Sequence, residues 1–262
     1  MRLPNVFNIC AALVLAFALA SPMYAQNGDE FDFDDIPVDD ARQYYVAVGG
    51  GYLGMLAFPN FDELNTVSRG LGLPDFEGQL YMNGGGGLIS LLVVPNMRLG
   101  IFGASGSRII QSDVTLPEGS YKRSLRFTST ITAAQVDYAI RLFRSFTILP
   151  GVMIGAGSYN LELTQSRNNG ENFPDIFQTG NAAVANRYAR ISRGHFFWNP
   201  ALNLEFAATQ FVMFRAGVGY SGTAWPGSWT DGAEVAVNNV PDINADGLTL
   251  QFGVFVGLFQ TQ

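Results

Sequence analysis

Five charged side chains stand in otherwise apolar stretches of this 262-residue chain: Arg98, Asp137, Arg141, Glu205 and Arg215. Apolar residues alternate there with small or polar ones, and the charges fall on the polar side of the alternation. Glu205 and Arg215 are each five residues from position 210, so a tight hairpin centred there would set them opposite each other. Buried charges are costly unless they are paired. The set therefore predicts an ion-paired cluster that fills the inside of a sheet, with a charge-lined pore as the alternative.

Residues suited to metal or nucleophilic chemistry are scarce. His195 is the only histidine, and Cys10, the only cysteine, lies in an apolar N-terminal segment. Metal-ligand spacing and thiolate chemistry are therefore not expected, and we predict no cofactor. A lone histidine could act as a general base, but Ser192 and Ser221 lack the spacing of a supporting nucleophile. We favour an interfacial position for His195 beside aromatic residues.

Two tryptophans mark the segment 222–247 as a possible recognition element. Trp225 and Trp229 lie among four acidic residues, so exposed indoles rimmed by carboxylates could bind a ligand or a partner. Anchoring at a membrane interface explains the tryptophans equally well. The acids at 241–246 offer oxygen ligands but no complete calcium loop, and a solvated loop is the prediction there.

The elements that would position these residues are strands joined by connectors of two lengths. Short joints fall at 94–97, 143–146 and 207–211, and long polar stretches at 58–78, 106–122, 165–187 and 222–247. Eight strands are expected: 43–57, 78–93, 97–107, 125–143, 146–163, 188–207, 211–221 and 248–259. Tight turns on one rim and loops on the other are typical of a closed antiparallel transmembrane β-barrel. A further hairpin, best placed at 234–240, would make ten strands.

Composition favours a membrane barrel over a soluble sheet protein. The chain is 48% hydrophobic and only 14% charged, against about 25% charged in typical soluble domains. A soluble sandwich or lipocalin-like barrel is the alternative, but the second face of each strand carries Gly, Ala, Thr, Asn and Gln rather than charge. The net charge of −7 argues against nucleic acid as a partner.

Three segments precede or cap the sheet. Residues 1–25 are predicted as a signal peptide and 26–42 as an acidic periplasmic tail, which leaves 43–262 for the barrel. Asn60 and Glu63 resemble a capping box for a short helix in the first long connector. Phe61, Leu64 and Val67 give that helix one apolar stripe. It would pack over the barrel mouth, or alternatively serve as a lid or docking element.

The even strand count and the terminal segment 248–259 resemble the small eight-stranded outer-membrane β-barrels of the OmpA/OmpX kind, over about residues 43–259. In that class the last strand carries the assembly signal and ends on an aromatic residue; here three residues follow Phe259. The resemblance implies the outer membrane of a Gram-negative-type cell. It also implies outer-membrane lipid, lipopolysaccharide and the barrel assembly machinery as partners, with an unknown surface ligand.

Some barrels of this class modify lipid A. The deacylases among them pair their histidine with a serine two positions on, where this chain has Phe197. We therefore predict a non-enzymatic surface protein with a filled polar lumen and four outer loops. A narrow ion or small-solute channel and a lipid A-modifying enzyme centred on His195 are the alternatives.

Overall fold

The computed structural model describes residues 46–91, 93–117, 119–143, 145–167, 187–243 and 245–259. The predicted signal peptide, the acidic tail and most of the connector 165–187 lie outside these residues. The described elements are β1 Ala47–Pro59, α2 Asp62–Gly70, β2 Leu80–Ser90, β3 Met97–Leu116, β4 Gly119–Tyr138, β5 Ile140–Phe143, β6 Phe146–Arg167, β7 Arg187–Ala207, β8 Val212–Ala224, β9 Thr230–Asp231 and β10 Gly247–Phe259. Among them, no helix is long and apolar enough to cross a membrane.

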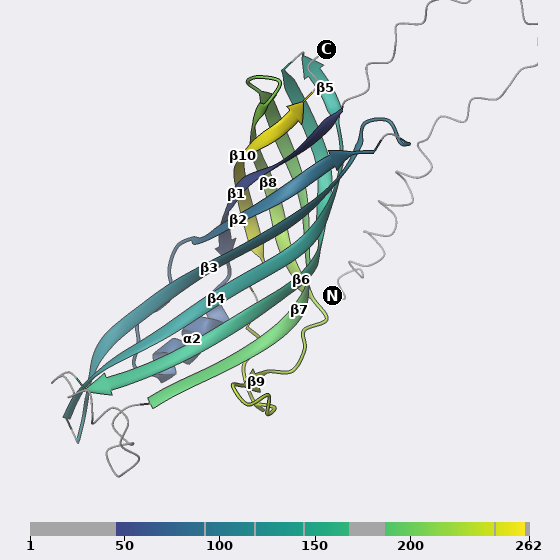
Figure 1. Cartoon of the computed structure of the whole chain (residues 1–262). Helices are drawn as coiled ribbons and strands as arrows, with labels where there is room; N and C mark the ends of the chain where they lie inside the picture. Colours follow the sequence, from purple (N-terminus) through teal and green to yellow (C-terminus); the bar gives the residue numbers. More distant parts are fainter. Residues whose placement is uncertain are drawn as a thin grey trace, which may run out of the picture. The chain divides into compact units, whose positions relative to one another are not determined.

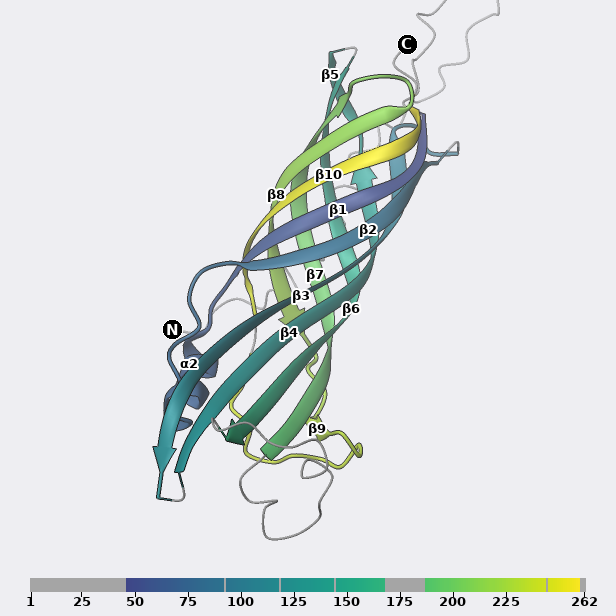
Figure 2. The same ribbon diagram turned by 60° about the vertical axis from the view of Figure 1, so that its left-hand side comes forward.

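Antiparallel pairing closes these strands into a ring of eight, β1–β2–β3–β4–β6–β7–β8–β10, with β10 back on β1 (Figures 1 and 2). β5 continues the path of β4 along β6. β9 pairs with Ile191 and Ser192 of β7, and Thr230 also bridges to Ala236 within the same connector; β9 stays outside the ring. The predicted eight-stranded barrel is confirmed, and the described part of 222–247 adds no hairpin to it.

Four strands are much longer than the rest. β3, β4, β6 and β7 have 20, 20, 22 and 21 residues, whereas β1, β8 and β10 have 13 each. They run on together beyond the other strands at the end that carries the long connectors (Figures 1 and 2). The prediction of a loop at 106–122 is wrong, because β3 and β4 pair along this stretch up to Leu116 and Gly119.

The extension of these strands beyond the ring is covered on its inner face by α2. Asp62 N donates to Asn60 Oδ1 at 2.8 Å at the start of the helix. Phe61 and Leu64 are buried, and the ring of Phe61 meets Phe127 of β4 edge-on at 6.0 Å. Arg123 of β4 donates to the carbonyl of Leu71 just beyond the helix. The predicted helix in the first connector is confirmed, and it packs on the strand extension.

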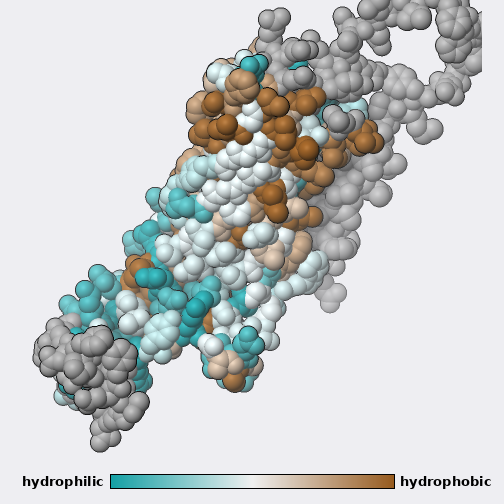
Figure 3. Space-filling view, in the orientation of Figure 1, coloured by the Kyte–Doolittle hydropathy of each residue, from teal (hydrophilic) through white to brown (hydrophobic). Residues whose placement is uncertain are grey.

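The outer surface around the short-turn end is apolar. Side chains that leave the sheet there are exposed and hydrophobic on every strand of the ring, and they form the brown region in Figure 3. Aromatic residues lie near both edges of this region: Phe143, Phe146 and Phe206 by the short turns, and Tyr52, Tyr81 and Tyr220 toward the outer end. Such an outward apolar belt with aromatic girdles is how a barrel meets lipid.

Candidate functional site

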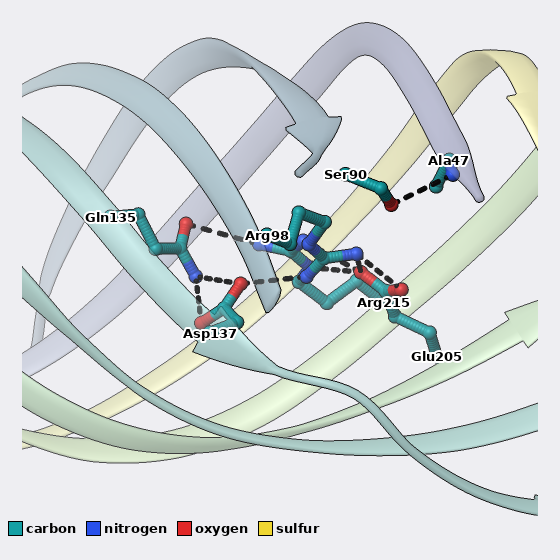
Figure 4. Close-up of polar contacts among 7 residues, drawn as sticks. All are labelled: Ala47, Ser90, Arg98, Gln135, Asp137, Glu205 and Arg215. Carbon is teal, nitrogen blue, oxygen red and sulfur yellow. Dashed lines mark hydrogen bonds and ion pairs between the residues drawn. The ribbon is translucent and has the colours of Figure 1, made fainter. Parts of the chain in front are cut away.

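The barrel interior holds a set of charged and polar contacts near the short-turn end, which we call the ion cluster: Arg98, Gln135, Asp137, Glu205 and Arg215 (Figure 4). Arg98 donates to Asp137 Oδ2 at 2.7 Å and to Glu205 Oε2 at 2.7 Å. Arg215 donates to Glu205 Oε1 through Nε at 2.8 Å and Nη2 at 2.6 Å. Every member is buried, with Glu205 only 1% exposed.

Gln135 links Asp137 to Arg215 in the ion cluster. It donates to Asp137 Oδ1 at 3.0 Å and accepts from Arg215 Nη1 at 3.2 Å. The guanidinium of Arg215 also lies 4.8 Å from the ring centre of Phe255. Two cations therefore face two carboxylates across four strands, β3, β4, β7 and β8, and the cluster is electrically neutral.

The structure brings together four of the five sequence-predicted charges. Glu205 and Arg215 are register partners on β7 and β8, as their spacing from position 210 predicts. Arg98 and Asp137 are register partners on β3 and β4. Arg141 instead sits half-buried on β5 near the rim, opposite Thr147 of β6. Gln135 was not among the predicted residues, although it shares the inward parity of Asp137.

A second layer of inward side chains lies further toward the outer end. Asn199 of β7 donates to Thr249 Oγ1 at 2.9 Å and accepts from Gln251 at 3.1 Å, with both partners on β10. Asn203 of β7 is 1% exposed and lies between this group and Glu205 along the same strand. Amide and hydroxyl groups thus fill the interior above the ion cluster.

His195 occupies the interior at the outer end of the barrel. It is 6% exposed, and its ring stacks on Tyr159 with centroids 4.1 Å apart. Tyr159 Oη lies 2.8 Å from Thr223 Oγ1 and accepts from Ala245 N at 3.2 Å. The predicted interfacial position for His195 is wrong. The reason is strand parity: His195 is ten residues from Glu205 on β7 and shares its inward face.

The remaining space beside His195 is small. A cavity of about 20 Å³ lies against His195, Tyr159, Ser221 and Thr223. That is room for about one water molecule. Gly157 of β6 stands opposite His195, and a Cβ added there would lie 2.2 Å from the imidazole Nε2. The glycine is therefore what lets the ring lie flat inside the barrel.

The connector between β8 and β10 folds back over the mouth and is held by Arg193. The guanidinium of Arg193 is 3.1 Å from Asp242 Oδ1, donates to the carbonyl of Ile243, and lies 5.0 Å from the ring centre of Trp229. Ile243 is 1% exposed and Trp229 5%. We call Tyr159, Arg193, His195, Trp229 and Ile243 the mouth layer.

The two tryptophans considered for surface binding differ in exposure. Trp229 is buried in the mouth layer, so the expectation of an exposed indole is wrong for this residue. Trp229 is buried because the connector folds inward, and no local sequence pattern indicates this fold. Trp225 is 70% exposed and contacts Phe196 with ring centroids 5.0 Å apart, at the outer edge of the apolar belt. Among the described residues, no cluster of three or more histidine, cysteine or carboxylate side chains that could hold a metal ion is present.

No protein family model matches the chain, and no curated protein matches it by sequence. Among solved structures, Ail, the attachment invasion locus protein of Yersinia pestis, matches in complex with the heparin analogue sucrose octasulfate with a TM-score of 0.37 and 10% identity, over 83% of this chain and 99% of that chain. Ail alone matches with a TM-score of 0.35, 10% identity and the same coverage. The outer membrane protease OmpT of Escherichia coli matches with a TM-score of 0.32 and 11% identity, over 82% of this chain and 93% of that one.

The hydrogen-bonded ring of strands identifies the fold as a closed barrel. In lipid every backbone polar group must be paired within the protein, and a closed barrel is the form in which a sheet meets this demand. The chain has that ring and an apolar outer belt. It is an eight-stranded antiparallel β-barrel with the outer surface of a transmembrane protein.

Proposed function

We propose that this barrel lies in the outer membrane as a non-enzymatic surface protein with a closed lumen. It presents its outer connectors and strand extension for structural or binding roles. The observation that carries the proposal is the filling of the interior at two levels. The ion cluster blocks the end near the short turns, and the mouth layer blocks the outer end. An eight-stranded barrel is just wide enough for its side chains to fill.

The channel alternative is disfavoured by the charge balance of the interior. A permeating ion would have to separate Arg98 and Arg215 from Glu205, whose contacts with them are 2.6–2.9 Å long and shielded from water. Breaking a buried ion pair leaves an uncompensated charge, which costs several kcal/mol. The cavity beside His195, at about 20 Å³, offers no path around the ion cluster.

The lipid A-modifying alternative is disfavoured by the position of His195. A general base must come within hydrogen-bond reach of the group it activates. His195 faces the lumen beneath Trp229 and Ile243, whereas the acyl chains of a lipid would lie against the opposite face of β7. Phe197, which stands where the deacylases have serine, is buried in the same interior.

In this proposal, β10 contacts outer-membrane lipid and is the strand that the barrel assembly machinery recognises. Its outward residues alternate from Leu248 to Leu258, and all thirteen of its residues pair with β1 to close the ring. A strand that both faces lipid and completes the barrel is suited to recognition during insertion.

Planar-bilayer recording with the refolded full chain tests the closed lumen. Folding is checked first by the heat-dependent shift in gel mobility. The wild type is expected to give no discrete conductance steps. Ala133→Trp, inside the barrel, and Ala134→Trp, on its outer face, form a matched pair. Steps in the wild type that the inner substitution removes and the outer one leaves would overturn the closed lumen.

Analysis of lipid A tests the absence of an enzymatic role. Membranes that express the wild type are expected to contain lipid A of unchanged mass. A changed lipid A in these membranes, which returns to normal with His195→Ala, would contradict the non-enzymatic assignment.

A further inference from the structure

Two methionines and the only histidine of the chain line one small cavity inside the barrel. Met55 of β1 and Met82 of β2 are register partners, and both are buried in the interior, with 1% and 3% of their surface exposed. His195 lies on β7, which stands opposite β2 in the ring because three strands separate the two on either side. All three residues are in the wall of the cavity of about 20 Å³. Side chains from opposite walls of the barrel therefore meet at one level of the lumen.

His195 brings a ring nitrogen to this cavity that no protein group uses. The atoms of its ring that lie against Gly157 are Nε2, Cε1 and Cδ2, so Nδ1 is on the side away from β6. Nδ1 is shielded from solvent and has no hydrogen-bond partner. The hydroxyls of the cavity wall bond elsewhere, since Ser221 donates to a backbone carbonyl at 3.2 Å and Thr223 Oγ1 is 2.8 Å from Tyr159 Oη. A buried polar atom without a partner is costly, which indicates that Nδ1 has a ligand.

The donor set of the cavity is soft and carries no charge. Thioether sulfur and imidazole nitrogen are ligands that suit copper(I), whereas hard ions such as calcium and magnesium take oxygen. Among the residues that the structure describes, no carboxylate lines the cavity, so the charge of a divalent ion would be poorly compensated there. A soft monovalent ion fits this set better. The spacing of histidine and cysteine in the sequence does not indicate such a site, because two of its three ligands are methionines.

We propose that Met55, Met82 and His195 bind one soft monovalent metal ion of the copper(I) class, through the two thioether sulfurs and the imidazole Nδ1. The cavity has room for about one water molecule, which suits a single ion without its hydration shell. Binding is a simple association and leaves the oxidation state of the ion unchanged. The site goes beyond the proposed surface role and does not depend on it.

Methionine is also a common filler of irregular cores, so the proposal needs a comparison within the same barrel. Met153 of β6 and Met213 of β8 provide it. Both are buried in the interior, with 1% of their surface exposed, but they stand outside the wall of this cavity. A metal ligand and a core filler can therefore be told apart by replacing one pair of methionines or the other.

Calorimetric titration with silver(I) tests the site, because this ion is soft, monovalent and resistant to oxidation. The full chain carries Cys10→Ser, which removes the one thiol, and is refolded in detergent micelles in a chloride-free buffer. It is expected to bind one equivalent of silver. Met55→Leu/Met82→Leu keeps the side-chain volume and should raise the dissociation constant at least about a hundredfold, with each lost donor worth about tenfold. Met153→Leu/Met213→Leu is the matched control and should leave the dissociation constant unchanged.

Nuclear magnetic resonance of isotope-labelled methionine methyl groups gives a second readout, which does not depend on affinity. One equivalent of silver(I), or of copper(I) added without oxygen, should move the signals of the two cavity methionines and leave those of the control pair in place. Zinc(II) should move none of them. His195→Gln should raise the dissociation constant for silver about tenfold, since it removes the imidazole Nδ1.

The proposal is overturned if the chain with Cys10→Ser binds no silver, or if the cavity variant Met55→Leu/Met82→Leu binds it as tightly as the control variant does. It is also overturned if zinc(II) moves the signals of the cavity methionines, or if copper(I) leaves them in place. Folding of each variant is checked by the heat-dependent shift in gel mobility. The closed lumen is judged separately by conductance, so the two proposals can fail independently.

Discussion

Replacing Glu205 by glutamine should destabilise the barrel more than any other single change in the ion cluster. The carboxylate receives hydrogen bonds from Arg98 at 2.7 and 2.9 Å and from Arg215 at 2.6 and 2.8 Å. The substitution leaves two buried guanidinium groups opposite the single carboxylate of Asp137. Removing one partner of a buried ion pair typically costs about 3–5 kcal/mol, and we expect a loss of that size in the free energy of unfolding.

Denaturant titration of the barrel in lipid vesicles measures this loss, with tryptophan fluorescence and gel mobility as two probes of unfolding. Lys122→Gln is the control, because this lysine is exposed on the outward face of the strand extension, and it should cost less than about 1 kcal/mol. Glu205→Leu/Arg215→Met should recover more than half of the loss, since one cation and one anion then remain. A cost for Glu205→Gln no larger than that of the control would refute the argument that the cluster needs its central carboxylate.

Three other changes test the mouth layer and the first connector. Gly157→Ala should lower stability by about 1–3 kcal/mol in the same titration, because the new methyl group would overlap the imidazole of His195. Arg193→Ala should shift tryptophan emission to the red and increase its quenching by acrylamide, because Trp229 loses the guanidinium that covers it. Asp75 beside α2 has a pKa held below its usual range by the hydrogen bond from the adjacent arginine. A lowered pKa gives stability that is present above the unfolded value of about 4 and is lost as pH falls through the folded pKa. The protection factors of the amides in 69–75, which allow for the intrinsic pH dependence of exchange, should therefore fall only in acid, and Asp75→Asn should remove this acid dependence.

Each of these predictions has an outcome that contradicts it. In a His195→Ala background, Gly157→Ala should cost little; a cost as large as in the wild type would place the clash elsewhere. Unchanged emission in the Arg193 variant would mean that the connector is held over the mouth by other contacts. Equal acid dependence in Asp75→Asn and the wild type would assign the effect to another carboxylate.

The strands of the membrane ring could be predicted from the sequence because lipid imposes a strict rule on them. Outward residues must be apolar there, so the alternation of apolar with small or polar residues around Val136, Leu204 and Val254 is easy to recognise in the sequence. The tight hairpin centred on position 210 predicted Glu205 opposite Arg215, and the two are register partners. The face of an inward charge follows from parity alone, which is a local property of a strand.

The rule fails where the strands leave the membrane. On the extension of β3 and β4, outward residues such as Ser107 and Arg126 meet no acyl chains, and polarity there suggests a loop. The signal that identifies a strand is the inward alternation at Tyr121, Leu125 and Phe127, all of which are buried. Likewise, parity counted from Glu205 would have placed His195 inside the lumen. The burial of Trp229 depends on a distant segment and could not be read locally.

The inward row of β7 has a consequence for how the barrel assembles. Arg193, His195, Asn199 and Glu205 lie on one face of one strand and contact partners at several levels of the interior. A slip of β7 by two residues keeps its apolar face toward lipid, so lipid alone does not reject it. Such a slip would separate three pairs at the same time: Glu205 from Arg215, Arg193 from Asp242, and His195 from Gly157. The polar interior thus fixes the register of β7, because a slipped strand would lose contacts at several levels of the interior.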